Sequence, residues 1–72
     1  MEIVEIKKKD RLRREVAAAR LHALADMLAS RNEVEFERDG IRFNVHVPDE
    51  VDFKVELEVE TDERELEIEL TW

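Results

Sequence analysis

The sequence predicts an α+β fold with the element order β-α-β-β-β-β, in which one helix packs on one face of a mostly antiparallel five-stranded sheet, in two layers. Two consecutive segments, 51–60 and 65–72, alternate apolar and polar residues, as strands of a half-buried sheet do. A single alanine- and leucine-rich stretch precedes them, and the pair Asp39-Gly40 indicates a tight hairpin. At 72 residues, we expect a single domain over 1–72.

Composition excludes several classes of protein. The chain has no cysteine, so it has neither a disulfide nor a thiolate metal site. No apolar run approaches the ~20 residues of a membrane span, and the charged N-terminus lacks the apolar region of a signal peptide. We therefore expect a cytoplasmic protein without membrane contact.

The net charge of −8 is unevenly distributed along the chain. Residues 1–32 hold eight basic and five acidic side chains, whereas residues 33–72 hold four basic and fifteen acidic ones. Only four of the basic residues are lysines. This composition fits adaptation to a salty cytoplasm and also fits an ordinary acidic protein, and composition alone does not separate the two.

A short strand is predicted over residues 2–7, and a dense basic segment follows it. This basic segment consists of Lys7, Lys8, Lys9, Arg11, Arg13 and Arg14. Such a cluster can bind nucleic acid or another polyanion. It has no interleaved aromatic side chain on which bases could stack, and the acidic remainder of the chain repels phosphate. We favour pairing with acidic side chains of the sheet and keep polyanion binding as the alternative.

The helix is predicted from an N-cap at Asp10 to about residue 29. Its alanines and leucines are good helix formers, and apolar residues recur at three- and four-residue steps along one side. These residues are Leu12, Val16, Ala17, Leu21, Leu24 and Leu28. Asn32 can adopt the left-handed conformation that ends a helix.

The aspartate-glycine turn joins strands predicted over 33–38 and 41–47. It sets Phe36 opposite Phe43, and so places apolar residues on one face of the hairpin and opposite charges on the other.

After a proline-containing loop, the strand over 51–60 is expected to pair with the strand over 41–47. This pairing sets His46 between Glu33 and Asp52. One imidazole with two carboxylates can hold a divalent metal or orient a base, but a sheet surface has no pocket. We interpret the row as ion pairs, and predict no catalytic residue, no metal site and no cofactor, and therefore no enzyme.

The last strand, over 65–72, carries an acidic face and the only tryptophan. A turn over 61–64 places like charges opposite one another, at a cost of a few tenths to about 1 kcal/mol for each pair. The expected pairs are Glu60 with Glu65, Glu58 with Glu67 and Glu56 with Glu69. These six glutamates form the candidate acidic face for a partner, and Trp72 is expected to close the core under the helix.

Two placements of the first strand are open. A right-handed crossover through the helix favours pairing with the last strand, which brings Lys7 beside the glutamates. The sheet order is then first, fifth, fourth, third, second. Pairing with the strand over 33–38 is the alternative.

The whole chain resembles the amphi-Trp domain, a small domain of salt-loving archaea and some bacteria. The resemblance is carried by the basic junction over 7–14, the Leu24-Ala25-Asp26 stretch of the helix, the Val47-Pro48-Asp49-Glu50-Val51 break and the acidic strand that ends on Trp72. A common variant of the family has serine or threonine at the helix start, where this chain has Arg13-Arg14-Glu15-Val16. The resemblance implies the fold and a saline habitat, and it implies no biochemical activity.

Two functions from different classes follow. We expect a non-enzymatic interaction module, which either forms a homodimer or presents its acidic face or a strand edge to a protein partner. The alternative is a binder of nucleic acid or another polyanion through the basic segment.

Overall fold

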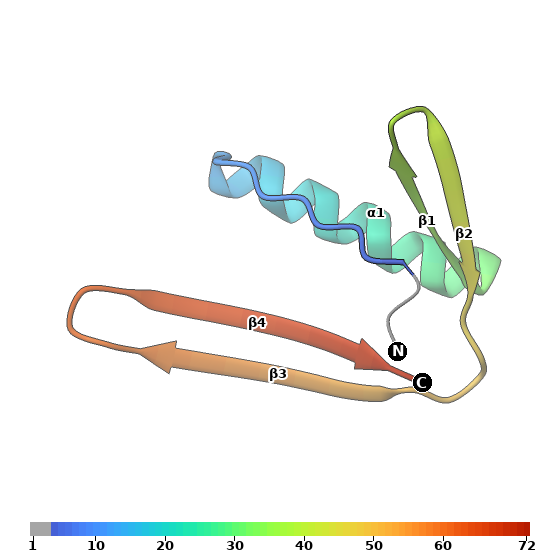
Figure 1. Cartoon of the computed structure of the whole chain (residues 1–72). Coiled ribbons are helices and arrows are strands. Elements are labelled where there is room, and N and C mark those ends of the chain that lie inside the picture. The colour runs from blue at the N-terminus through green and yellow to red at the C-terminus, as the bar shows by residue number, and fades with distance from the viewer. Residues whose placement is uncertain (1–3) are drawn as a thin grey trace.

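The computed structural model describes residues 4–72 and contains one helix followed by two separate β-hairpins (Figure 1). The helix α1 covers Arg14–Arg31, the strands β1 and β2 cover Glu33–Arg38 and Ile41–His46, and the strands β3 and β4 cover Asp52–Val59 and Arg64–Thr71. Both hairpins are antiparallel, and no ladder joins them within the described residues. The α+β class is confirmed, whereas the single five-stranded sheet is wrong.

Helix α1 begins three residues later than predicted. Its N-cap is Arg13, which makes no side-chain cap hydrogen bond, and the Arg13 carbonyl accepts two backbone amides of the first turn at 3.1 and 3.0 Å. The predicted cap, Asp10, instead accepts a hydrogen bond from Nη1 of Arg20 at 2.9 Å. The later start keeps Arg11 and Arg13 out of the first turn, where the helix dipole disfavours cations, and places Glu15 there.

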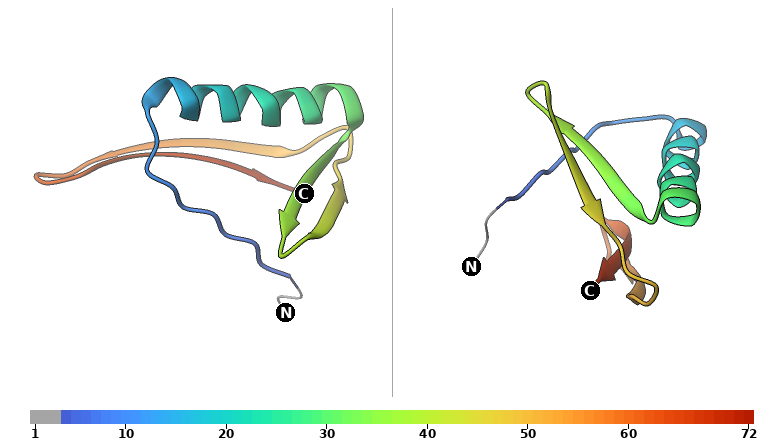
Figure 2. Two further views of the ribbon diagram at one scale, coloured as in Figure 1. Left: turned by 90° about the horizontal axis from the view of Figure 1, so that it is seen from above. Right: turned by 90° about the vertical axis from the view of Figure 1, so that its right-hand side faces the viewer.

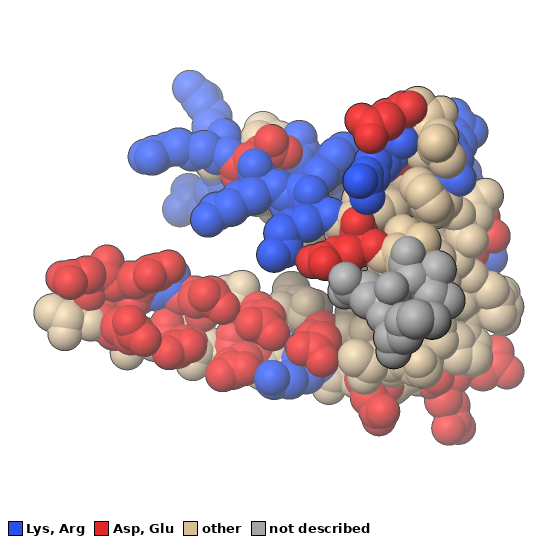
Figure 3. All heavy atoms as spheres, viewed as in Figure 1, with Lys and Arg blue, Asp and Glu red and all other residues tan. Residues whose placement is uncertain are grey.

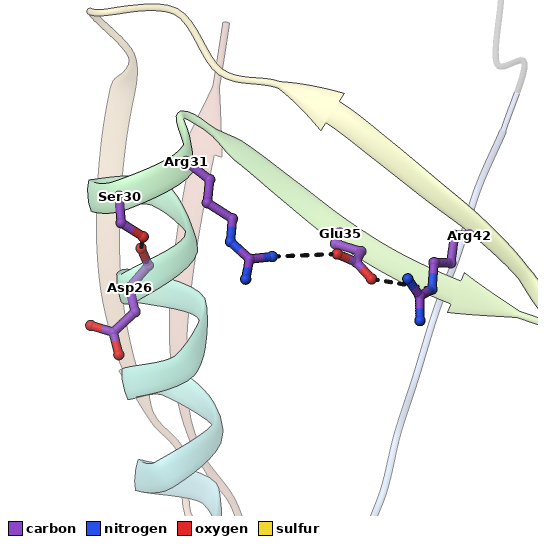
Figure 4. A network of polar contacts seen from close by, with 5 residues as sticks. All are labelled: Asp26, Ser30, Arg31, Glu35 and Arg42. Carbon is purple, nitrogen blue, oxygen red and sulfur yellow. Dashed lines mark hydrogen bonds and ion pairs between the residues drawn. The ribbon is translucent and has the colours of Figure 1, made fainter.

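The end of α1 is tied to the first hairpin by one carboxylate (Figure 4). The two oxygens of the half-buried Glu35 in β1 lie 3.7 Å from Nη1 of Arg31 and 3.4 Å from Nε of Arg42. Close by, the hydroxyl of Ser30 donates to the carbonyl of Asp26 at 2.6 Å. Glu35 therefore connects the helix to both strands, a role that the sequence analysis missed.

The predicted register of the first hairpin is confirmed, including Phe36 opposite Phe43. Asp39 and Gly40 have φ angles of 53° and 79°, the left-handed conformation that a two-residue hairpin turn requires at both positions. Asn32 ends the helix with a φ of 54°, also as predicted.

The predicted pairing of 41–47 with 51–60 is wrong because the chain turns away after β2. The amide of Val47 donates to the carbonyl of Asn32 at 2.8 Å, and the next residue, Pro48, has no amide to donate. Val47 is 7% exposed, the one buried hydrophobic side chain of the described residues. These contacts bind the linker to the helix end, so β3 starts away from β2.

The N-terminal segment lies beside the first hairpin. Of the predicted strand over 2–7, residues 2 and 3 lie outside the described residues, and residues 4–7 form no strand. A hollow on the apolar face of β1 and β2 is lined by Val4, Ile6, Phe36, Phe43 and Val45. The Glu5 carbonyl accepts a hydrogen bond from Nη1 of Arg38 at 3.1 Å. The predicted sheet order is thus wrong: the N-terminal segment reaches the first hairpin, and the helix contacts that hairpin from its charged face through Glu35.

The three elements diverge from one end of the molecule, where the end of α1, the linker and the C-terminus converge (Figure 2). The backbone of α1 lies close to β1 but not to β3 or β4, and only at the junction do Leu28 of α1 and Leu70 of β4 line a common hollow. The radius of gyration is 14.1 Å, whereas a compact domain of this length has a radius of gyration of about 11 Å. Among residues 4–72, the predicted two-layer core therefore does not form.

Replacing Gly40 with alanine should destabilise the first hairpin. A Cβ at this position would meet no atom within 4 Å, so the cost comes from the left-handed backbone and should be about 1–2 kcal/mol. Urea denaturation followed by circular dichroism measures it. Gly40→Asn is the control, because asparagine tolerates this conformation, and it should cost less; equal losses for both variants would contradict this account of the turn.

Candidate interaction surface

The basic segment is exposed along its whole length. Residues 7–13 form an irregular lead-in to the helix, and Arg14 is the first residue of α1. Within the described residues, Arg14 pairs with Glu15 at 3.5 Å, and no ion pair is found for Lys7, Lys8, Lys9, Arg11 or Arg13. The cations therefore lie together in water with few local partners.

The acidic side chains lie on one face of β3 and β4, in a register two residues away from the predicted one. The observed pairs are Lys54 with Glu69, Glu56 with Glu67 and Glu58 with Glu65, while Glu60 lies outside the ladder. The three predicted glutamate pairs are wrong. The amide of Glu60 donates to the carbonyl of Glu63 at 2.8 Å, so residues 60–63 form the turn and Arg64 joins β4.

Lys54 reduces the repulsion on this face. In the observed register Lys54, instead of the predicted Glu56, is opposite Glu69. The Nζ of Lys54 also lies 3.0 Å from Oε2 of Glu56 on the same strand. The hydrogen bond and the charge of Glu56, followed by the charges of Glu69 and Glu67, raise the pKa of Lys54. Two like-charge pairs remain, so the acidic face is still under-compensated.

The opposite face of the same hairpin is apolar. Three cross-strand pairs, Phe53 with Leu70, Val55 with Ile68 and Leu57 with Leu66, make up this apolar hairpin face. Leu57 is 70% exposed, and only Leu70, near the junction, is half-buried. A two-stranded hairpin is marginally stable in water on its own, so this face requires a cover.

The sequence analysis placed these side chains in a core and missed them as functional candidates. A usable signal was available. A helix about 10 Å wide covers roughly two strands spaced about 4.8 Å apart. One helix was therefore too narrow for the five strands that the sequence predicts, and part of the apolar surface had to remain uncovered.

The basic segment and the acidic face gather on the same side of the molecule (Figure 3). Lysine and arginine side chains cluster over the start of α1, and aspartate and glutamate side chains cluster over β3 and β4. Within the described residues no ion pair joins the two groups. On this face of the molecule, a basic region over the start of α1 thus lies beside an acidic region over β3 and β4.

The histidine row does not assemble as predicted. Glu33 is opposite His46, as expected, but Asp52 pairs with Thr71 in the second hairpin. Among the residues that the structure describes, no group of three histidine or acidic side chains is placed to hold a metal ion.

Trp72 closes no core in the part of the chain that the structure describes. It is 55% exposed and lines an open hollow with Glu50, Val51, Asp52 and Thr71. The tryptophan therefore adds to the apolar area that faces solvent.

Comparison with known proteins identifies one family. A family model described as the Amphi-Trp domain matches residues 1–72. Neither the curated proteins nor the solved structures include a match to the chain. Across residues 4–72, no helix is both long and apolar enough to cross a membrane.

Lys54→Met removes the cation beside Glu56 and should lower the unfolding temperature at about 0.01 M salt, where the Debye length is about 30 Å. The loss should be smaller at about 1 M salt, because the Debye length there is only about 3 Å. Because the folded state raises the pKa of Lys54, the stabilisation is present at neutral pH and is lost as the pH rises through that value, above 10.5. Thermal unfolding at several salt concentrations and pH values measures both effects.

Arg64→Met is the matched control for this experiment. It removes one positive charge from the same hairpin, at a position opposite Val59 and outside the glutamate pairs. Its effect should be smaller at low salt. Equal losses for the two variants, or a loss for Lys54→Met that salt leaves unchanged, would contradict the role given to Lys54.

Proposed function

The chain belongs to the Amphi-Trp domain family over residues 1–72, and from this premise we propose that the protein is a non-enzymatic interaction module whose docking surface is the apolar hairpin face. The observation that carries the proposal is the exposure of three stacked apolar pairs on one regular ladder. Monomeric proteins seldom leave a contiguous apolar patch of this kind in water, and such patches mark interaction sites. A flat strand pair also presents its side chains in fixed rows, which suits recognition of a complementary surface.

Charge gives this docking surface its specificity. The second hairpin and its flanks, residues 51–72, contain nine acidic and two basic side chains. A partner with cations at the margin of its own apolar surface is attracted, and an acidic partner is repelled. The acidic excess and the few lysines also fit work in a salty cytoplasm, where short Debye lengths weaken the repulsion among the glutamates.

Capture of binding partners from a native extract tests the docking surface. Leu57→Glu places a charge in the middle of the apolar hairpin face and should abolish capture, because a buried unpaired charge is costly. Ile41→Glu is the matched control: Ile41 is 60% exposed, lies on the other hairpin and is opposite Arg38. It should leave capture unchanged. Equal recovery of partners by wild type and Leu57→Glu would refute the proposal.

Polyanion binding through the basic segment is the second candidate, favoured by the exposure of Lys7, Lys8 and Lys9 without ion-pair partners in the described chain. The acidic face on the same side of the molecule opposes it. We expect no binding of a single-stranded oligonucleotide in fluorescence anisotropy, even at about 0.01 M salt, where attraction to phosphate is least screened. Saturable binding that Lys8→Glu/Lys9→Glu removes would establish the second candidate instead.

A further inference from the structure

The single chain exposes far more surface than a finished domain of its size. Its solvent-accessible area is 7098 Å². A compact monomer of 8.6 kDa exposes about 4,700 Å², so the excess is about 2,400 Å². If two chains hid this excess from each other, about 4,800 Å² would leave water, which lies within the 2,000–5,000 Å² of obligate homodimers.

The uncovered apolar surface lies in two places that are not in contact. One is the apolar hairpin face. The other surrounds the start of α1, where Leu12, Val16 and Leu21 are exposed. Among the described residues, neither surface covers the other: their side chains stay exposed, and only at the junction do Leu28 of α1 and Leu70 of β4 line a common hollow.

The helix and the lead-in segment are arranged to hold both faces of a hairpin. They diverge from the start of α1, with α1 on one side and residues 7–13 on the other (Figure 2). The exposed leucines and valine at the helix start suit the apolar face of a hairpin. The lysines and arginines of the lead-in suit its acidic face. In the single chain the β3–β4 hairpin runs beside α1 (Figure 2), but the two backbones stay too far apart for α1 to cover it. The pairs Val55–Ile68 and Leu57–Leu66 therefore remain exposed.

Charge complementarity selects a second copy of this chain as the occupant. Residues 4–14 hold six basic and two acidic side chains, and residues 51–72 hold two basic and nine acidic ones. Both regions are present in every copy. In a two-fold dimer the basic region of each copy therefore meets the acidic region of the other, and the same contact forms twice. The net charge of −8 opposes association of two copies, and the opposite signs of the facing regions offset this repulsion.

We propose that two copies of the chain form a two-fold dimer in which the β3–β4 hairpin of each copy lies over the start of α1 of the other. The proposal rests on the interaction role given to the apolar hairpin face and names its occupant. The dimer supplies each hairpin with a cover that residues 4–72 of its own chain do not provide.

Sedimentation velocity across micromolar concentrations tests the dimer. Wild type should sediment with twice the monomer mass of 8.6 kDa. Leu57→Glu should raise the dissociation constant about 100-fold or more, because it buries an unpaired charge at the contact. Ile41→Glu, on the first hairpin, should leave the dimer intact. A monomeric wild type, or a Leu57→Glu variant that dimerises as wild type does, would overturn the proposal.

A charge exchange between two variants tests the arrangement and guards against loss of folding. Lys8→Glu/Lys9→Glu reverses the lead-in, and Glu65→Lys/Glu67→Lys reverses the acidic face. Each variant alone should dimerise at least about 10-fold more weakly than wild type, since like charges then meet. An equimolar mixture should recover the dimer, because opposite charges meet at both contacts. A mixture no more associated than its parts would overturn the arrangement.

The outcomes separate this inference from the proposed function. A monomeric chain that still captures another protein through Leu57 would refute the dimer and leave the interaction role standing. A dimer that is insensitive to Leu57→Glu, together with unchanged capture, would refute both.

Discussion

A two-stranded hairpin with one apolar face cannot bury that face by itself in water, and the other features of the structure follow from this constraint. The β3–β4 hairpin pairs apolar residues along one side, and no element of the described chain covers the pairs Val55 with Ile68 and Leu57 with Leu66. Backbone hydrogen bonds hold the two strands in register, but burial of the apolar face provides most of the stability of a sheet. The extended shape and the large exposed area both reflect the uncovered apolar hairpin face, and the proposed partner is the surface that would cover it.

The electrostatics of the hairpin take second place to this apolar constraint. Glutamates occupy the outer face because period-2 alternation puts every second residue there, and opposite residues then carry like charge. The turn lies one residue earlier than predicted, over 60–63, so that Lys54 is opposite Glu69, which relieves part of the repulsion. The cations that could relieve the rest lie at the start of α1 and form no ion pair with the hairpin within the described residues. Charge is therefore segregated within one chain in a way that favours pairing between chains.

Local chemistry predicted some elements of the fold well and others poorly. The Asp39-Gly40 turn accommodates only one loop length, so the register of the first hairpin followed from the sequence. The turn between β3 and β4 has no glycine, and a four-residue turn over 60–63 fits the same alternation as one over 61–64. Both positions keep the apolar residues on one face, so the pattern could not choose between them. The helix start moved because Asp10 binds Arg20 instead of capping the first turn.

By itself, the sequence determined the helix and the four strands over residues 14–72, the two-faced character of both hairpins and the separation of charge, because these depend on side-chain period and on turn residues close in the chain. Only the tertiary structure decided that the hairpins do not share a sheet and that the helix leaves the second hairpin uncovered. The reason is that strand pairing across a linker depends on where the linker is bound. The amide of Val47 is taken by the carbonyl of Asn32, which directs β3 away from β2. The alternation of apolar and acidic residues does not predict this hydrogen bond between Val47 and Asn32. Because the bond directs β3 away from β2, the apolar hairpin face stays uncovered.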